Sequence, residues 1–389
     1  MSWRNSSLVT AQVSDQLTNY IEENKLESHV VEIFEDVLET EASKDYLTID
    51  HNSRKVHYNM AISTQQRIHL SNLISILYPA RTIYSPFKGV FPLSSEQIPV
   101  VKSDLDTRGF HVFDTPLSDS ICDGLIQGLE DISFHTKKST KKIQNLTENS
   151  VSKKINGNTA WATNQQDILK LEEVQKIAFD ENLLNLVGDF LGSEPILCQT
   201  NCWWSVANST HRSNLSTNAQ LFHQDTEYLK FVKVFIYLTD VNKDNGPHQY
   251  VQGTSKIAQS ELGKDYKPSN RVEDKTVNEI FGEENVLTFT GQKGSVIIED
   301  TFGLHKGTPV KEGSRLLLQL EYCNSLYFHS GYSFGKDELL SDIDALATSS
   351  PRVFSNFTKD VNELNEDKFK YFNSRSFTQK LKDKIKSYL

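Results

Sequence analysis

The spacing of apolar residues divides the first part of the chain into helical and extended stretches. In residues 9–24, 27–42 and 64–78, apolar positions recur every three or four residues, which predicts three amphipathic helices. Residues 46–60 instead resemble a β-hairpin, with short extended runs on either side of a polar turn. We therefore expect residues 1–100 to form an appended layer that is mostly helical.

The pattern changes after the first hundred residues. Residues 109–132 predict a short strand followed by a helix with Ser118 or Asp119 as its N-cap. The next stretch, residues 133–161, is polar, rich in lysine and without a period, so we expect a mobile loop there. A solvated loop over an active site accounts for these lysines better than a nucleic-acid contact does. Residues 168–192 return to a helical pattern.

Short runs of β-branched and aromatic residues follow, separated by Gly, Asn, Asp or Pro turns. Seven such runs favour a barrel or a two-sheet sandwich of jelly-roll type, and hence an α+β protein with a mainly β core. We expect a helical extension (residues 1–100), a barrel core (residues 101–335) and a C-terminal helical segment packed on the core (residues 336–389). The runs are residues 195–207, 221–227, 231–241, 249–255, 286–291, 294–302 and 314–324.

The segment LFHQDTEY, residues 221–228, places His223 and Asp225 two positions apart. One such pair is expected by chance in a chain with 11 histidines, so a metal site needs a partner on another strand. We favour His305, which follows the penultimate β run, over His248, which lies in a turn where a solvated or capping histidine is expected. Two imidazoles and one carboxylate leave three positions open on an ion, as non-haem Fe(II) requires, although a catalytic zinc could use the same residues.

Arg315 narrows the identity of this metal. It lies ten residues beyond His305, near the start of the next expected strand. A guanidinium there can pair bidentately with the distal carboxylate of a small dicarboxylic acid whose other end chelates the metal. A surface ion pair at a barrel rim is the alternative role, and the spacing from the histidine favours the anchoring role.

Three segments in this order, HQD, DNGPHQYVQGTSK and GSVIIEDTFGLHKGTPVKEGSR, resemble the motifs of the phytanoyl-CoA dioxygenase family of Fe(II)/2-oxoglutarate oxygenases. The turn VQGTSK departs from the family's usual Pro-Gly-Ser-His. The resemblance covers about residues 101–330 and implies a double-stranded β-helix, a jelly-roll or cupin-like barrel flanked by helices. It implies O₂ as a co-substrate, Arg315 as the 2-oxoglutarate anchor, and three iron ligands, His223, Asp225 and His305.

Three further residues are candidates for contacts in the cavity. Side chains alternate along residues 231–240, so Lys233 shares a face with Phe235, while the aliphatic alternate positions suit packing against helices. The mixed face is either solvated or turned toward the cavity. In the second case Lys233 offers its charge to an acidic group of 2-oxoglutarate or of the substrate. The resemblance implies that the strand carrying Gln199 and Asn201 supplies polar contacts to 2-oxoglutarate.

The resemblance implies an Fe(II)- and 2-oxoglutarate-dependent dioxygenase that oxidises an unactivated C–H bond of a small molecule and releases succinate and CO₂. Hydroxylation is the default outcome, with desaturation or cyclisation left open. The lysine-rich stretch and Lys233 suggest an anionic or amino-acid-like substrate. The alternative is a non-catalytic jelly-roll protein that binds a metal or another ligand, but such a protein has no need for Arg315.

Charge and composition limit the partners. The formal net charge of −10 argues against a nucleic-acid partner, and no run approaches the ~20 apolar residues that span a bilayer. The first residues lack the features of a signal peptide, and the four cysteines are scattered, as is typical of reduced thiols. We expect a cytoplasmic protein without membrane contact, whose N-terminal helices are a candidate homodimer contact.

Overall fold

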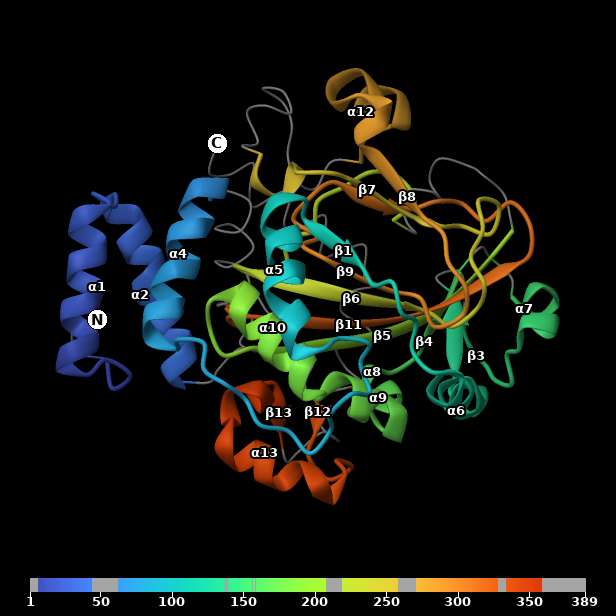
Figure 1. The fold of residues 1–389 in the computed structure, drawn as a ribbon, viewed down its shortest axis with the longest axis horizontal. Helices are drawn as coiled ribbons and strands as arrows, with labels where there is room; N and C mark the ends of the chain where they lie inside the picture. The colour runs from blue at the N-terminus through green and yellow to red at the C-terminus, as the bar shows by residue number, and fades with distance from the viewer. Residues whose placement is uncertain are drawn as a thin grey trace.

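The computed structural model contains an eight-stranded antiparallel sheet and a smaller three-stranded sheet (Figure 1). It describes residues 6–43, 62–136, 139–155, 157, 159–207, 219–257, 271–327 and 334–358. The strands are β1 (Phe110–Val112), β2 (Phe134–Thr136), β3 (Ser139–Ile143), β4 (Thr159–Ala162), β5 (Ile196–Val206), β6 (Phe231–Tyr237), β7 (His248–Val251), β8 (Val286–Phe289), β9 (Val296–Glu299), β10 (His305–Gly307), β11 (Ser314–Cys323), β12 (Phe334–Gly335) and β13 (Phe357–Thr358). The large sheet has the order β1-β9-β6-β11-β5-β4-β2-β3, the small sheet β10-β7-β8, and β12 pairs with β13 in parallel. This is the jelly-roll core expected from the sequence.

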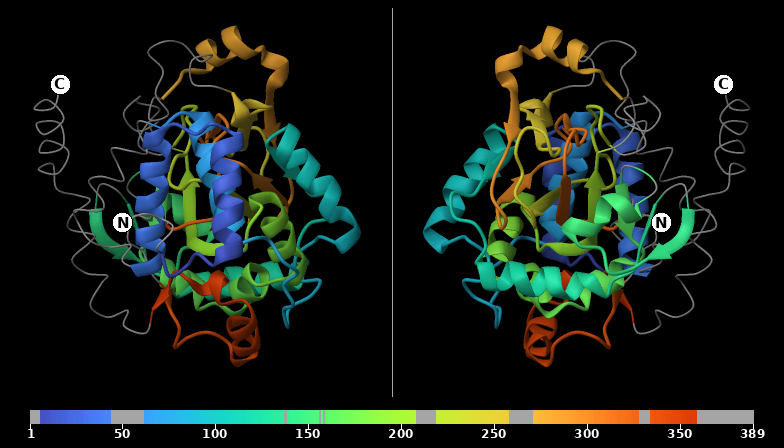
Figure 2. Two further views of the ribbon diagram at one scale, coloured as in Figure 1. Left: turned by 90° about the vertical axis from the view of Figure 1, so that its left-hand side faces the viewer. Right: turned by 90° about the vertical axis from the view of Figure 1, so that its right-hand side faces the viewer.

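Helices cover one face of the large sheet, and three more form a layer at one side of the barrel (Figure 1 and Figure 2). Those predicted near the N-terminus and after Ser118 are confirmed, and Ser118 is the N-cap, accepting from the backbone of Ile121. No described helix has the length and apolar character that a bilayer crossing requires. The predicted hairpin at 46–60 lies outside the described residues. The helices are α1 (Ala11–Glu23), α2 (Ser28–Ser43), α4 (Thr64–Leu77), α5 (Ile98–Thr107), α6 (Asp119–Glu130), α7 (Glu148–Lys154), α8 (Gln165–Leu169), α9 (Glu172–Ala178), α10 (Glu181–Leu191), α12 (Asp274–Phe281) and α13 (Asp344–Ser349).

The two faces of the large sheet differ in chemistry. On β6, Val232, Val234 and Ile236 are fully buried in the apolar cluster that includes the covering helices. Burying each such side chain contributes about 1.5–3 kcal/mol. Phe235 and Tyr237 point the other way and pack against residues of the small sheet. The predicted alternation is therefore confirmed, and the mixed face lines the inside of the barrel.

Cross-strand pairing arranges the inward side chains in rows, because directly opposite residues share a face. Lys233 on β6 lies opposite Glu321 on β11, which lies opposite Gln199 on β5. The first row is thus charged and polar, and it lies at the opposite end of the barrel from Arg315. Successive rows are Phe235, Gln319 and Asn201, then Tyr237, Leu317 and Trp203, and finally Arg315 with Ser205.

The prediction of a mobile loop at residues 133–161 is wrong. The segment forms the β2–β3 hairpin, α7 and β4, which extend the large sheet beyond β5. Phe134 and Ala160 are buried in the main apolar cluster, while Lys141 and Lys142 are exposed on the edge strand β3. Lysines are common on edge strands because they discourage pairing with other chains. The polar composition therefore indicates a sheet edge rather than an irregular loop.

The N-terminal helices α1, α2 and α4 share an apolar cluster of their own, which also takes in Leu229 from the barrel. Polar contacts also join this layer to the barrel, through Arg67, and to the C-terminal segment, through Glu41. Nη1 of Arg67 on α4 donates to the carbonyl oxygen of Tyr228 at 2.5 Å, and Glu41 on α2 forms a buried ion pair with Arg352 at 3.2 Å. The layer thus contacts the barrel at Tyr228 and Leu229, a few residues beyond His223 and Asp225.

Candidate metal centre

His223 and Asp225 lie on the segment between β5 and β6, which runs antiparallel to the chain entering β10. The backbones of His223 and His305 exchange two hydrogen bonds of 3.1 and 3.0 Å, and the backbone N–H of Asp225 donates to the carbonyl oxygen of Thr301 at 2.9 Å. In the described structure the predicted run at 221–227 makes isolated bridges of this kind rather than a regular strand. The pairing brings two segments far apart in sequence to one point.

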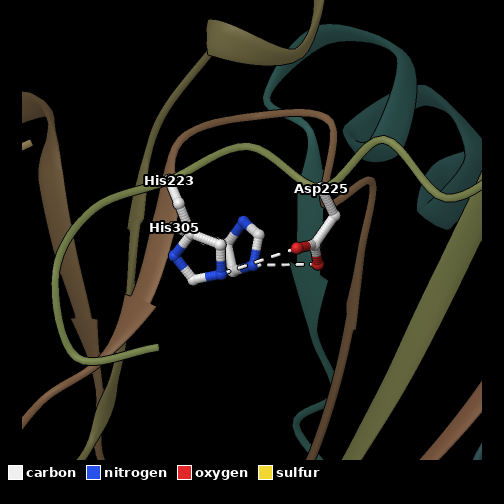
Figure 3. Close-up of side chains that lie close together, drawn as sticks. All are labelled: His223, Asp225 and His305. Atoms are coloured by element: carbon white, nitrogen blue, oxygen red, sulfur yellow. Dashed lines mark ion pairs between the residues drawn. The ribbon is translucent and has the colours of Figure 1, made fainter. Parts of the chain in front are cut away.

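The three side chains converge on that point (Figure 3). Nε2 of His223 lies 3.5 Å from one carboxylate oxygen of Asp225, and Nε2 of His305 lies 3.2 Å from the other. One ligand atom from each residue lies within 4.8 Å of the others. Ligands at right angles on an ion with bonds of about 2.1 Å are separated by about 3 Å, so this spacing fits a metal. Both histidines are 4% exposed and are therefore held rigidly.

Backbone carbonyls fix the orientation of both imidazoles. Nδ1 of His223 lies 2.9 Å from the carbonyl oxygen of Leu221, and Nδ1 of His305 lies 2.9 Å from that of Gly303. Each Nδ1 therefore carries the proton and donates, which leaves the Nε2 lone pair free for a metal. Burial and the neighbouring His305 hold the pKa of His223 well below its usual range. His223 is thus in the neutral form that binds metals.

Lys233 determines the charge state of Asp225. Its Nζ lies 2.7 Å from Asp225 Oδ2, 3.5 Å from Glu227 and 3.6 Å from Glu321. Burial alone raises the pKa of Asp225, but Lys233 and the two imidazoles outweigh it and hold this pKa well below its usual range. That Lys233 contacts an acid of 2-oxoglutarate or of the substrate stays a prediction. In the structure its ammonium is surrounded by carboxylates of the protein.

Arg315 is a buried cation that, among the described residues, forms no ion pair with a carboxylate. Its Nη1 donates to the carbonyl oxygen of Gly246, its Nη2 donates to Ser205 Oγ at 3.5 Å, and its Nε has no partner in the described part of the chain. Gly246 has a φ of +87°, and a Cβ there would come within 2.7 Å of Val310, so glycine is needed to present this carbonyl. A buried guanidinium with a free donor fits an incoming carboxylate.

His248 is not the solvated or capping residue expected of a turn. It is 6% exposed, begins β7, and stacks on His305 with ring centres 5.7 Å apart. Its Nε2 lies 2.9 Å from Glu299 Oε2. Burial lowers the pKa of His248 well below its usual range and raises that of Glu299 to about 8, so both changes favour a neutral pair. The His248 ring, held by Glu299, therefore packs against the candidate ligand His305.

The turn that departs from the resembled motif supports the same ligand. Thr254 Oγ1 donates to the carbonyl oxygen of Val251 at 2.6 Å and accepts from the backbone N–H of Leu304 at 2.8 Å. Leu304 immediately precedes His305. The hydroxyl therefore ties the turn to the strand that presents this histidine.

Gln199 and Asn201 lie on the inward face of β5 and are hydrogen-bonded to each other at 3.2 Å. Their contact with 2-oxoglutarate stays a prediction. Sequence reasoning missed the inward carboxylates Glu227 and Glu321. The alternation of side chains along a strand could have identified Glu321. Arg315 lies six positions before it on β11, an even number, so the two side chains share one face of the sheet.

Comparison with known sequences gives one family. The model of the phytanoyl-CoA dioxygenase family, PhyH, matches residues 105–315, more than half of the chain and a span that contains all four principal candidates. No curated protein matches the sequence.

Solved structures with a similar fold include those of HygX, EctD and SnoK. HygX from Streptomyces hygroscopicus with nickel and 2-oxoglutarate bound has a TM-score of 0.40 and 17% identity, over 59% of this chain and 87% of its own. EctD from S. alaskensis in its apoform has a TM-score of 0.41 and 15% identity, over 63% and 82%. SnoK, a non-heme alpha ketoglutarate dependent carbocyclase from nogalamycin biosynthesis, has a TM-score of 0.41 and 15% identity, over 59% and 86%.

Proposed function

The chain belongs to the phytanoyl-CoA dioxygenase family, and we propose that it hydroxylates an unactivated C–H bond of a small-molecule substrate. It is a non-haem Fe(II)/2-oxoglutarate-dependent dioxygenase, with Fe(II), 2-oxoglutarate and O₂ as its cofactor and co-substrates. When bound, these groups supply an oxidation in which one oxygen atom of O₂ enters the substrate and the other converts 2-oxoglutarate to succinate and CO₂. Desaturation or ring closure is the alternative outcome and differs in the mass of the product.

The observation that carries this proposal is the convergence of His223, Asp225 and His305 in the same barrel as Arg315, which forms no ion pair with a carboxylate in the described part of the chain. We assign the three converging residues as the iron ligands. A ligand set of two imidazoles and one carboxylate leaves open positions, whereas a structural zinc site would be closed by four protein ligands.

We assign Arg315 to the distal carboxylate of 2-oxoglutarate. Its free donor and lack of an acidic partner among the described residues suit this task. Lys233 keeps Asp225 ionised and holds its carboxylate at 2.7 Å, so it orients one ligand while the backbone carbonyls orient the other two. The protein thus holds the reacting groups in position and excludes water from them.

Further assignments rest on the sequence alone. We propose that the oxygenase core spans residues 101–335, between the N-terminal layer and a C-terminal segment, and that the protein is cytoplasmic. The N-terminal helices are the proposed homodimer contact, which sedimentation of the full chain at increasing concentration would test.

The proposed function is tested by anaerobic titration of the metal-free protein with Fe(II) and then 2-oxoglutarate. Chelation of Fe(II) by the keto acid gives a weak visible charge-transfer band. We expect this band in the unmodified protein and its loss in His305→Ala. The control is His111→Ala, which removes a histidine paired with Asp104 on the surface side of β1 and should leave the band intact. A correctly folded protein that gives no band would favour the non-catalytic binding role.

A further inference from the structure

A cavity of about 290 Å³ lies on the outer face of the large sheet, the face turned away from the converging ligands. Its floor is formed by Trp204 on β5, Leu316 on β11 and Leu238, which directly follows β6, and all three side chains belong to the apolar cluster on that face. Ile126 on α6 lines one side. The volume is close to the lower end of the range for small-molecule sites, about 300–1,000 Å³. We call this space the outer cavity.

One polar group among the floor residues lacks a hydrogen-bond partner. Trp204 is 2% exposed, and its indole Nε1–H donates to no acceptor in the described part of the chain. Its neighbours across the sheet are Ala160 and Leu316, whose side chains offer only hydrocarbon. A buried N–H without an acceptor is destabilising, because the group has lost its water and gained nothing in return. A ligand with an oxygen acceptor would supply the missing partner.

The rim of the outer cavity determines which charge a ligand can carry. Nζ of Lys293 lies 3.1 Å from Asp119 and 2.8 Å from Asp123, so the charge of this cation is already matched. Asp240 and Glu148 add two more carboxylates to the lining, which disfavours an anion. The floor is apolar, so an ammonium group placed on it would also lose its water without compensation. The ligand that fits is therefore uncharged.

The floor of the outer cavity is continuous with the residues that hold Arg315. Leu316 directly follows Arg315, and Trp204 directly precedes Ser205, so alternation places each pair on opposite faces of the sheet. On the inner face Arg315 Nη2 donates to Ser205 Oγ at 3.5 Å. The backbone N–H of Leu316 donates to Thr239 Oγ1 at 3.1 Å, and Thr239 also lines the outer cavity. A ligand in the cavity therefore contacts both strands that position Arg315.

We propose that the outer cavity binds a small uncharged molecule whose apolar body packs on Leu238 and Leu316 and whose carbonyl oxygen accepts from Trp204. We further expect its binding to tighten that of 2-oxoglutarate, and this second part rests on the proposed function of Arg315. The cavity and the position of Arg315 belong to the same conformation, so a ligand that binds this conformation stabilises both. The coupling is reciprocal, because each ligand changes the affinity of the other by the same factor.

The site is tested with the full, metal-free chain and three probes of nearly equal shape: cyclohexyl methyl ketone, cyclohexanecarboxylate and 1-cyclohexylethylamine. The protein has four tryptophans, and loss of one indole N–H signal in Trp204→Phe identifies the resonance of Trp204 in a nitrogen–proton correlation spectrum. We expect the ketone to shift this signal in a saturable manner. The carboxylate and the amine should bind about tenfold more weakly.

Three variants locate the ketone, with the rise in melting temperature as the measure of affinity in all of them. Trp204→Phe keeps an aromatic ring without the donor and should weaken the ketone by about tenfold. The matched control is Trp203→Phe, which changes the neighbouring residue on the opposite face of the sheet and should leave the affinity unchanged. Ile126→Phe fills part of the cavity from α6 and should abolish binding while the Trp204 donor remains.

The coupling is measured in the anaerobic protein with Fe(II), where the visible band reports 2-oxoglutarate. Saturating ketone should lower the dissociation constant of 2-oxoglutarate by about fivefold, and Ile126→Phe should remove this effect. If no band forms, the proposed function fails, while the indole signal still decides whether the outer cavity binds the ketone.

Three results would overturn the inference. The site is refuted if no probe shifts the Trp204 signal, or if the ketone binds equally well to Trp204→Phe and Ile126→Phe. Equal or tighter binding of the carboxylate or the amine would contradict an uncharged ligand. A dissociation constant of 2-oxoglutarate that saturating ketone leaves unchanged would show that the outer cavity is not coupled to Arg315.

Discussion

The two ends of the barrel interior have opposite charge arrangements. At one end Arg315 is a buried cation that, among the described residues, pairs with no carboxylate and is held by the Gly246 carbonyl and Ser205. At the other end Glu227 and Glu321 share a single ammonium group with Asp225. The Arg315 end therefore lacks the negative charge that the distal carboxylate of 2-oxoglutarate would bring, whereas the carboxylates at the other end already surround the ammonium group of Lys233. The difference teaches that a buried charge without an opposite partner, rather than a cluster of charges, indicates where a charged part of a ligand belongs.

The largest expected effect breaks the carboxylate end. Lys233→Met leaves the buried Glu321 and its neighbours Asp225 and Glu227 without their shared cation, and the free energy of unfolding should fall by about 3–5 kcal/mol. Urea denaturation at neutral pH measures this change. The matched control is Lys306→Met, which removes a lysine that is 3% exposed but pairs with an exposed Asp274 outside the barrel. Equal losses in the two variants would mean that the carboxylate cluster adds nothing beyond an ordinary ion pair.

Arg315→Ala removes the buried cation at the other end of the barrel. Loss of a buried charge-assisted contact should raise the dissociation constant of 2-oxoglutarate by about 100-fold, which corresponds to about 2.7 kcal/mol. Anaerobic titration followed through the visible band measures it. Arg315→Lys keeps the charge without the bidentate geometry, so its dissociation constant for 2-oxoglutarate should lie between those of the unmodified protein and Arg315→Ala. An affinity unchanged in Arg315→Ala would place the 2-oxoglutarate carboxylate elsewhere.

A smaller effect should come from the His248–Glu299 pair, which packs against His305. His248→Asn removes the stacked ring and leaves Glu299 without its partner, so Fe(II) affinity should fall by about tenfold. Competition with a chelator of known affinity measures this loss. Glu299→Gln keeps a hydrogen-bonding group at the same place and should retain most of the affinity. The supporting role of His248 would be refuted by equal Fe(II) affinity in His248→Asn and the unmodified protein.

The smallest effect should arise outside both ends. Thr254→Val removes one hydrogen bond to the backbone of Leu304 and should lower the free energy of unfolding by about 1 kcal/mol. Chemical denaturation measures it, with Thr254→Ser as the variant that keeps the hydroxyl. Because Thr254 contacts neither Arg315 nor the carboxylates around Lys233, the affinity for 2-oxoglutarate should stay unchanged. A weaker affinity for 2-oxoglutarate in Thr254→Val would show that the turn acts on the Arg315 end.

The sequence carried enough information for the elements but less for their pairing. The alternation of side chains along residues 231–237 predicted both faces of β6. The spacing of Arg315 from His305 predicted that these two residues belong to the same barrel. The lysine-rich stretch at 133–161 was misread because an edge strand with exposed lysines has the same composition as a loop. Composition reports exposure, and an edge strand is exposed on more sides than a central one.

The site shows the same limit. His248 was misread because the turn before it hides the start of β7, and its burial depends on Phe235 and His305 from other strands. Glu321 follows from strand phase, but its closeness to Lys233 depends on the register between β6 and β11. The contact of Arg67 with Tyr228 joins residues 161 positions apart, which periodicity cannot reveal.

That last contact bears on how far the oxygenase core is portable. The family match begins at residue 105, but the carbonyl of Tyr228, three residues beyond Asp225, receives its hydrogen bond from Arg67 on α4. Trimming the chain to the matched span would remove this donor and uncover Leu229, which is 2% exposed in the full chain. We therefore expect the smallest working enzyme to include α4, so that a barrel transplanted into another protein would need this helix as well.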